Sequence, residues 1–279
     1  MYLVLDIETV RDPDVMSQAC RRIEAWDGDT PSYETEEACL EREEAKICAQ
    51  QQGDNCFWPL RFQKPVLASL IAVDARFNYL GHKTVWGRSI KRVAEDFWQL
   101  IGEAPGAFGT QHIVTFNGKR FDMPVMEIAA MRYGIQCPWW FRDPTNKPWD
   151  QPRSFSSANR IHLDMLNELA TSGPTGGDLN FWSHVFGLPG KVDSNGADVA
   201  DLFEAEEWDR IQDYCLCDVL NTLGLLMGLY NMCYPELPGP RSQVFEHTMN
   251  TIIEARKAEG APSTELERYW KLYGSEIPF

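Results

Sequence analysis

The sequence predicts an α/β domain with a mixed β-sheet. Three observations support this class. The chain has 279 residues, of which 44% are hydrophobic and 12% aromatic, so it can bury a large core and is not a disordered chain. Strand-like runs follow one another directly in the first part of the chain. Later strand-like runs alternate with helical patterns, and this order favours a mixed sheet flanked by helices.

The strands are predicted from short β-branched and aliphatic runs. Residues 2–6 form such a run and are expected to be a buried strand. Residues 65–75 and 79–86 predict two strands joined by a turn. Two further strands are expected at 112–116, directly before an Asn-Gly turn, and at 160–166.

The helices are predicted from apolar residues at helical spacing. Ser89 is expected to cap a helix that runs to about residue 101. Helices are also expected at 122–133 and, more briefly, at 179–186. The longest helical pattern covers 206–230, and two more helical segments follow the Pro-rich breaker at 235–240.

We expect residues 1–279 to form a single domain with two additions. Residues 11–60 hold 12 acidic against 5 basic residues and are interpreted as an acidic, helical insertion that adds no chemistry. Residues 235–279 are interpreted as a C-terminal helical extension. Residues 135–158, which are rich in Pro, Trp and Arg, are expected to form a long loop.

Composition also limits the partners and the compartment. With 26 basic and 41 acidic residues the net charge is −15, which excludes a protein that coats long stretches of duplex. The longest plainly apolar stretch, 66–73, is too short to cross a bilayer, so no membrane partner is expected. The eight cysteines form no regular framework and the first residues carry no signal-peptide pattern, so we expect a cytoplasmic protein with reduced thiols.

Asp6 and Glu8 form the first of three carboxylate patterns. Alternate residues of a strand point to one face, so these two side chains should converge where the chain leaves the sheet. The same acid-x-acid spacing occurs at several other places in the chain. What separates this instance is the apolar run before it, because carboxylates at the edge of a core need a partner.

The other two patterns follow later strands and helices. In the first, Asn117 and Phe121 precede Asp122 directly after a predicted strand, although an N-cap would also explain this aspartate. In the second, Tyr214 and Asp218 stand four residues apart, on one face of the longest predicted helix. They lie at the border of its apolar stripe, where a side chain faces either a cleft or water.

Taken together, the three patterns resemble the DEDD superfamily of 3′–5′ exonucleases. The order is Asp-x-Glu on a first strand, Asn-x-x-x-Phe-Asp after a later strand, and Tyr-x-x-x-Asp on a late helix. The tyrosine form is typical of the DEDDy branch. The stretches Val-Thr-Phe-Asn-Gly-x-x-Phe-Asp-x-Pro and Tyr-Cys-x-x-Asp-Val look most like the predicted 3′–5′ exonucleases related to the proofreading domain of family B DNA polymerases. The resemblance spans about residues 1–231.

The resemblance implies a ribonuclease H-like fold and hydrolysis from the 3′ end with two divalent metals. By position, Asp6 would bridge both metals, Glu8 and Asp218 would hold the nucleophile-side metal, and Asp122 would support the second. Tyr214 would orient the attacking water. The chemistry agrees, because clustered carboxylates stay ionised only when cations neutralise them, and oxygen ligands favour Mg²⁺ or Mn²⁺.

Two further polar residues have more than one interpretation. Lys191 is similar in placement to a lysine that the family B exonuclease domains use near the scissile phosphate, and an exposed lysine after a turn is the alternative. Asp164 is either another acid of the pocket or a cap at a strand end, and it is not included in the predicted site.

A substrate path is suggested by residues 119–160, which hold seven basic and four acidic residues. Trp139 and Trp140 lie among these charges, and interleaved aromatic and basic residues suit single-strand binding. The alternative is that these rings pack onto the body of the protein. Asn117 and Phe121 are expected to contact the terminal nucleotide.

The sequence therefore predicts a metal-dependent 3′–5′ exonuclease acting on single-stranded 3′ ends, with DNA favoured. A 3′–5′ exoribonuclease is the alternative within the enzyme class. A catalytically silent nucleic-acid- or protein-binding module is disfavoured, because all four carboxylates and the tyrosine are present. No polymerase module fits in the remaining chain, so a proofreading role would need a separate polymerase or repair partner. The oligomeric state stays open.

Overall fold

The computed structural model describes most of the chain outside the acidic segment. The described residues are 1–15, 17–18, 38, 41–42, 44–46, 49, 58–108, 112–141, 152–153, 161–169, 177–191, 199–261 and 264–274. Most of the predicted 11–60 insertion therefore lies outside the described residues, as does most of the basic and aromatic stretch after residue 141.

A five-stranded mixed sheet forms the centre of the molecule, in the order β3-β2-β1-β4-β5. The strands are β1 (Tyr2–Arg11), β2 (Gln63–Val73), β3 (Tyr79–Trp86), β4 (His112–Thr115) and β5 (His162–Asp164). β1 pairs antiparallel with β2 and parallel with β4, and β4 pairs parallel with β5. The central strand is thus the first one in the chain, and the predicted ribonuclease H-like mixed sheet is confirmed.

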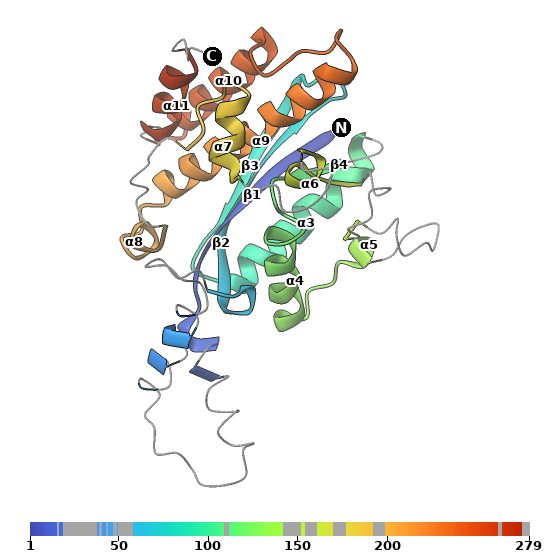
Figure 1. Cartoon of the computed structure of the whole chain (residues 1–279). Coiled ribbons are helices and arrows are strands. Elements are labelled where there is room, and N and C mark those ends of the chain that lie inside the picture. The colour runs from blue at the N-terminus through green and yellow to red at the C-terminus, as the bar shows by residue number, and fades with distance from the viewer. Residues whose placement is uncertain are drawn as a thin grey trace.

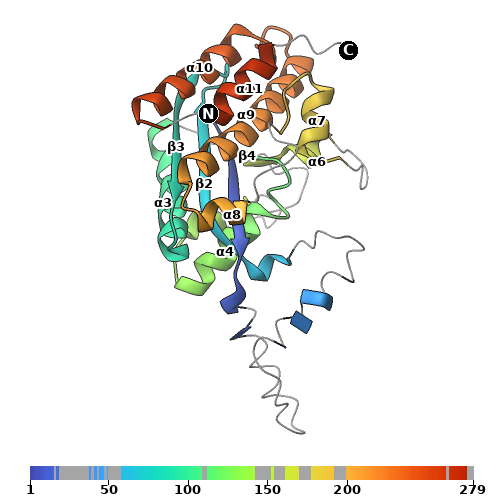
Figure 2. The same cartoon turned by 90° about the vertical axis from the view of Figure 1, so that its left-hand side faces the viewer.

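Helices cover both faces of this sheet (Figures 1 and 2). The helical elements of the described residues are η1 (Leu60–Phe62), α3 (Ile90–Phe108), α4 (Asp122–Tyr133), α5 (Pro138–Phe141), α6 (Met165–Leu169), α7 (Leu179–Val185), α8 (Val199–Glu204), α9 (Trp208–Cys233), α10 (Gln243–Ala258) and α11 (Thr264–Gly274). One core lies between the sheet and α3 with α4, and another lies between the sheet and α9 to α11.

The alternation of β1 decides where its carboxylates point. Leu3 and Leu5 are buried in the core with α3 and α4, whereas Val4 is buried in the core with α9. Successive side chains of a strand point to opposite faces, so the even-numbered Asp6 and Glu8 share the α9 face with Val4. The sheet therefore directs both acids toward the longest helix.

α9 is the helix against which the C-terminal helices pack. It is long and apolar enough, by length and composition alone, to cross a membrane, but most of it is buried inside the protein as a core helix. The predicted 235–279 extension contributes α10 and α11 to the α9 core through Phe245, Ile252 and Tyr269. Its Arg256 guanidinium lies 2.9 Å from the Asp213 carboxylate of α9, and both side chains are buried.

Some predicted bounds differ from the observed ones. Residues 160–166 were expected to form one strand, but β5 ends at Asp164 and α6 begins at Met165. The Asp164 carboxylate accepts a hydrogen bond from the Leu166 amide, so the side chain itself turns the backbone out of the sheet. The predicted loop at 135–158 contains the short helix α5, and α8 was not predicted.

Candidate active site

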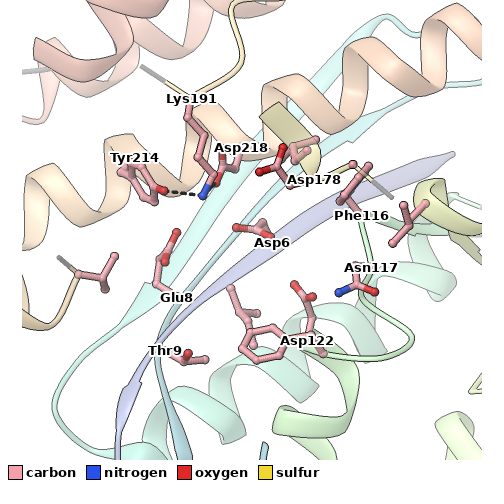
Figure 3. A pocket seen from close by; sticks show the side chains of 16 residues that line it. Asp6, Glu8, Thr9, Phe116, Asn117, Asp122, Asp178, Lys191, Tyr214 and Asp218 are labelled. Atoms are coloured by element: carbon pink, nitrogen blue, oxygen red, sulfur yellow. Dashed lines mark hydrogen bonds and ion pairs between the residues drawn. The ribbon is translucent and has the colours of Figure 1, made fainter. Parts of the chain in front are cut away.

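A cavity of about 660 Å³ opens between β1, the loop after β4 and the helices α7 and α9 (Figure 3). It gathers side chains from segments that are far apart in the sequence. The residues that line it are Asp6, Ile7, Glu8, Thr9, Phe116, Asn117, Phe121, Asp122, Leu166, Gly177, Asp178, Leu179, Lys191, Val199, Tyr214 and Asp218. All four predicted metal-ligating carboxylates are among them.

The first two carboxylates come from the end of the central strand. Asp6 is partly exposed to the cavity and Glu8 is 9% exposed. The buried thiol of Cys215 on α9 lies 3.5 Å from the Asp6 carbonyl oxygen and 3.7 Å from its carboxylate oxygen Oδ2. This weak hydrogen-bond donor and one carboxylate oxygen each of Asp6 and Glu8 lie within 4.8 Å of one another, so the three groups could hold a metal ion.

The Asn117 turn positions the third carboxylate. Asn117 has a φ of 63°, a left-handed conformation that asparagine tolerates better than most residues. The buried Asp164 carboxylate accepts hydrogen bonds from the amides of Asn117 at 2.8 Å and Lys119 at 3.0 Å. A β-carbon on Gly118 would overlap the Thr115 side chain, so glycine lets the turn pack closely. The turn leads directly into Asp122, the first residue of α4.

The fourth carboxylate lies on α9 together with the predicted tyrosine. Lys191 donates a hydrogen bond from Nζ to the Tyr214 hydroxyl at 2.8 Å, and its Nζ lies 3.8 Å from Asp218 Oδ2. The Lys191 amide in turn donates to the Asn180 side chain on α7 at 2.8 Å. Figure 3 shows Tyr214, Lys191 and Asp218 on one side of the cavity and Asp122 on the other.

Two carboxylate oxygens in this cavity are buried without a protein partner. Asp122 is 3% exposed and Asp218 is 6% exposed. Oδ1 of each accepts no hydrogen bond from the described part of the protein. A buried carboxylate oxygen without a donor is costly, so the pair indicates a place for a cation.

This geometry can be compared with known families. The model of a family described as predicted 3′–5′ exonucleases related to the exonuclease domain of PolB matches residues 55–271. The chain belongs to this family. The matched range contains Asp122, Lys191, Tyr214 and Asp218 but begins after Asp6 and Glu8. No curated protein matches the chain.

The fold of this exonuclease-family protein brings Asp6 and Glu8, which precede the matched range, to the residues within that range. β1 is the central strand of its sheet, between β2 and β4, both of which lie within residues 55–271. Asp6 and Glu8 therefore line the same cavity as Asp122 and Asp218. The acid-x-acid pattern at residue 6 therefore shares a cavity with Asp122 and Asp218, although it precedes the matched residues.

Burial makes these carboxyl groups hard to ionise in the absence of a cation. Burial, together with the negative charges of Asp122 and Glu8, raises the pKa of Asp6 well above its usual value. Burial, assisted by the Asp164 charge, raises the pKa of Asp122 to about 7. Burial also raises the pKa of Asp218 to about 6, although Lys191 opposes this change.

These raised pKa values predict how stability depends on pH in the metal-free exonuclease-family protein. The folded state holds protons on Asp122 and Asp218 that the unfolded state releases near pH 4. The contribution of these two groups to the free energy of unfolding therefore falls as pH rises from about 4 to about 7. In EDTA we expect the wild type to lose roughly 2 kcal/mol or more between pH 5 and pH 8 relative to the Asp122→Asn variant. Urea unfolding of both proteins measures the difference, and the comparison cancels the titrating groups that do not interact with Asp122. Parallel pH curves would show that Asp122 ionises normally.

One carboxylate of the cavity was missed in the sequence. Asp178 lines the cavity, and its Oδ1 accepts a hydrogen bond from the Phe181 amide at 2.9 Å, so it also caps α7. Figure 3 shows it near Asp218. An aspartate before a short helix gives only the signal of an N-cap, and nothing in the local sequence distinguishes a cap that also faces a cavity.

The predicted substrate-binding residues divide into two groups. Asn117 and Phe121 line the cavity as expected. Trp140 does not: it is fully buried, and its Nε1 donates to Glu127 at 2.6 Å. Trp139 packs against Trp98 and over Gly102, away from the cavity. The prediction that Trp140 stacks on a nucleic-acid base is therefore wrong, because its ring completes the α3 and α4 core.

Proposed function

We propose that this protein is a divalent-metal-dependent 3′–5′ exonuclease that acts on single-stranded ends, with DNA as the favoured substrate. Family membership supports a nuclease of this polarity. The observation that carries the proposal is the convergence of Asp6, Glu8, Asp122 and Asp218 in one cavity, where two of their buried oxygens accept no hydrogen bond from the described residues. Such a cluster is stable in ionised form only with added positive charge.

The residues present fit a pair of Mg²⁺ or Mn²⁺ ions. The four predicted ligands that line the cavity supply carboxylate oxygens, which hard cations prefer. The Cys215 thiol lies within 4.8 Å of the Asp6 and Glu8 oxygens but is not among the residues that line the cavity. Asp6, Glu8, Asp122 and Asp218 would hold the ions. When bound, such ions stabilise the charge that develops on a phosphodiester and promote ionisation of the attacking water.

The remaining polar residues would orient the reactants. The Tyr214 hydroxyl accepts its hydrogen bond from Lys191, so its own proton remains available to donate to a water molecule or a phosphate oxygen. Burial opposes ionisation of Lys191, but the charge of Asp218 and the contacts with Tyr214 raise its pKa overall, so it stays cationic beside the phosphate. On the opposite wall, Asn117 and Phe121 would contact the last nucleotide.

The substrate is tested with DNA and RNA strands of one sequence, each labelled at its 3′ end. With Mg²⁺ or Mn²⁺ we expect labelled mononucleotides to be released, faster from DNA, and EDTA to stop the release. Faster release from RNA would make the protein an exoribonuclease, since the same carboxylates serve both sugars. Binding of both strands without any release would favour a catalytically silent module.

A further inference from the structure

The outer face of α7 carries a large exposed aromatic ring beside the cavity. Phe181 is 53% exposed, and it follows closely after Gly177, Asp178 and Leu179, which line the cavity. A single exposed apolar side chain is ordinary on a protein surface. The position of this ring at the cavity rim, and its fixed orientation, set it apart.

The ring lies directly against the cavity wall. A β-carbon added to Gly177 would come within 2.8 Å of Phe181 Cδ1, so the ring and the cavity-lining backbone are in close contact. Gly177 lines the cavity, so this contact places the Phe181 ring next to one wall of the cavity.

Two contacts hold the ring in place. The Phe181 amide donates to the Asp178 side chain at 2.9 Å, which fixes the first turn of α7. The ring also packs edge-to-face on Trp182, with centroids 5.6 Å apart and planes at 83°. Trp182 is itself packed against the α9 core. Phe181 is therefore an exposed ring on a rigid support, which lowers the entropy lost when a flat group stacks on it.

The charges of residues 177–185 bear on which part of a nucleic-acid strand can contact this side of the cavity. Residues 177–185 contain Asp178 and no lysine or arginine. The neighbouring Lys191, whose amide bonds to Asn180 of α7, directs its Nζ to Tyr214 and Asp218. The exposed Phe181 ring therefore offers a stacking face to nucleobases, which stack on aromatic rings irrespective of sequence.

We propose that Phe181 is a stacking platform for the base of a nucleotide upstream of the one being removed, and that it contributes to recognition of unpaired strands. This inference rests on the proposed nuclease function, because it assumes that the 3′ end enters the cavity. It replaces the stacking surface expected at Trp140, which is buried.

The test measures equilibrium binding rather than turnover. All proteins carry Asp122→Asn to prevent cleavage, and fluorescence anisotropy with Mg²⁺ gives Kd for a labelled 12-nucleotide single strand. We expect Phe181→Ala to weaken binding at least about fivefold, and Phe181→Trp to retain binding within about twofold. Val185→Ala is the matched control, because Val185 is 50% exposed on the same helix, and it should leave Kd unchanged.

A second set of strands locates the stacked base. Each strand carries one abasic position, moved stepwise from the 3′ end. At one upstream position the abasic strand should bind the parent protein, which keeps Phe181, at least about fivefold more weakly than the intact strand does. The same abasic position should have little effect on binding to the Phe181→Ala protein. If every abasic position weakens both proteins equally, the ring does not stack and the inference is overturned. If the parent protein that keeps Phe181 binds none of the strands, the proposed function fails instead.

Discussion

We expect Asp6→Asn to lower the rate of the proposed 3′-end hydrolysis by at least about a thousandfold without lowering the stability of the metal-free protein. The activity should fall because Asp6 is the carboxylate surrounded by Glu8, Asp122 and Asp218, and its charge would hold the proposed cation. The stability does not fall, because the same neighbours repel Asp6 and burial opposes its ionisation. Single-turnover rates with Mg²⁺ and urea unfolding in EDTA provide the two readouts.

Glu204→Gln is the matched control for this prediction. Glu204 and Glu206 have the same acid-x-acid spacing, but both are exposed and neither lines the cavity. This variant should keep wild-type activity. An Asp6→Asn protein that keeps a tenth or more of wild-type activity would show that the four carboxylates are not the reacting site.

Arg256→Met is expected to destabilise the protein by about 3–5 kcal/mol at pH 8. Arg256 is 4% exposed, and its guanidinium donates a hydrogen bond at 2.9 Å to the carboxylate of Asp213, which is fully buried. Without this partner the Asp213 charge is left unpaired between α9 and α10. Burial already raises the pKa of Asp213 to about 6 despite Arg256, so at pH 5 the carboxyl can take up a proton and the loss should be smaller.

Urea unfolding at pH 5 and pH 8 measures both parts of this prediction. Lys257→Met is the control, because the ion pairs of the neighbouring Lys257 with described residues are exposed, at 3.1 Å to Glu267 and 3.6 Å to Glu254. Exposed pairs of this kind contribute little to stability. An Arg256→Met protein no less stable than the Lys257→Met protein would mean that Asp213 is neutral or solvated in the folded state.

The sequence was sufficient to predict the carboxylates that meet in the cavity. Strand periodicity places Asp6 and Glu8 on one face, and helix periodicity places Tyr214 and Asp218 on one face. Each of these periodicities is a local property, and the central position of β1 brings the two faces together. Lys191, to which the family resemblance drew attention, lines the same cavity and lies beside Tyr214, while its role near a phosphate stays a prediction.

Other features depend on long-range packing, which no local pattern reveals. Trp140 was expected at a binding surface because aromatic and basic residues alternate around it. Its ring instead packs in the core with α3 and α4, and its Nε1 donates a hydrogen bond to Glu127, 13 residues earlier. Phe181 has a local sequence that resembles any amphipathic turn, and only the approach of Gly177 places its ring at the cavity rim. Asp178 both caps α7 and lines the cavity, and its local sequence indicates only the cap.

The carboxylate cavity is proposed to remove nucleotides from a 3′ end with the help of divalent metal. The direct measurement uses a single-stranded DNA labelled at its 5′ end, incubated with Mg²⁺ and either the wild type or the Asp122→Asn protein. The wild type should produce a ladder that shortens one nucleotide at a time from the 3′ end, and EDTA and Asp122→Asn should each abolish it. Release of the 5′ label as a mononucleotide at the earliest times, or an unchanged ladder with Asp122→Asn, would contradict the account.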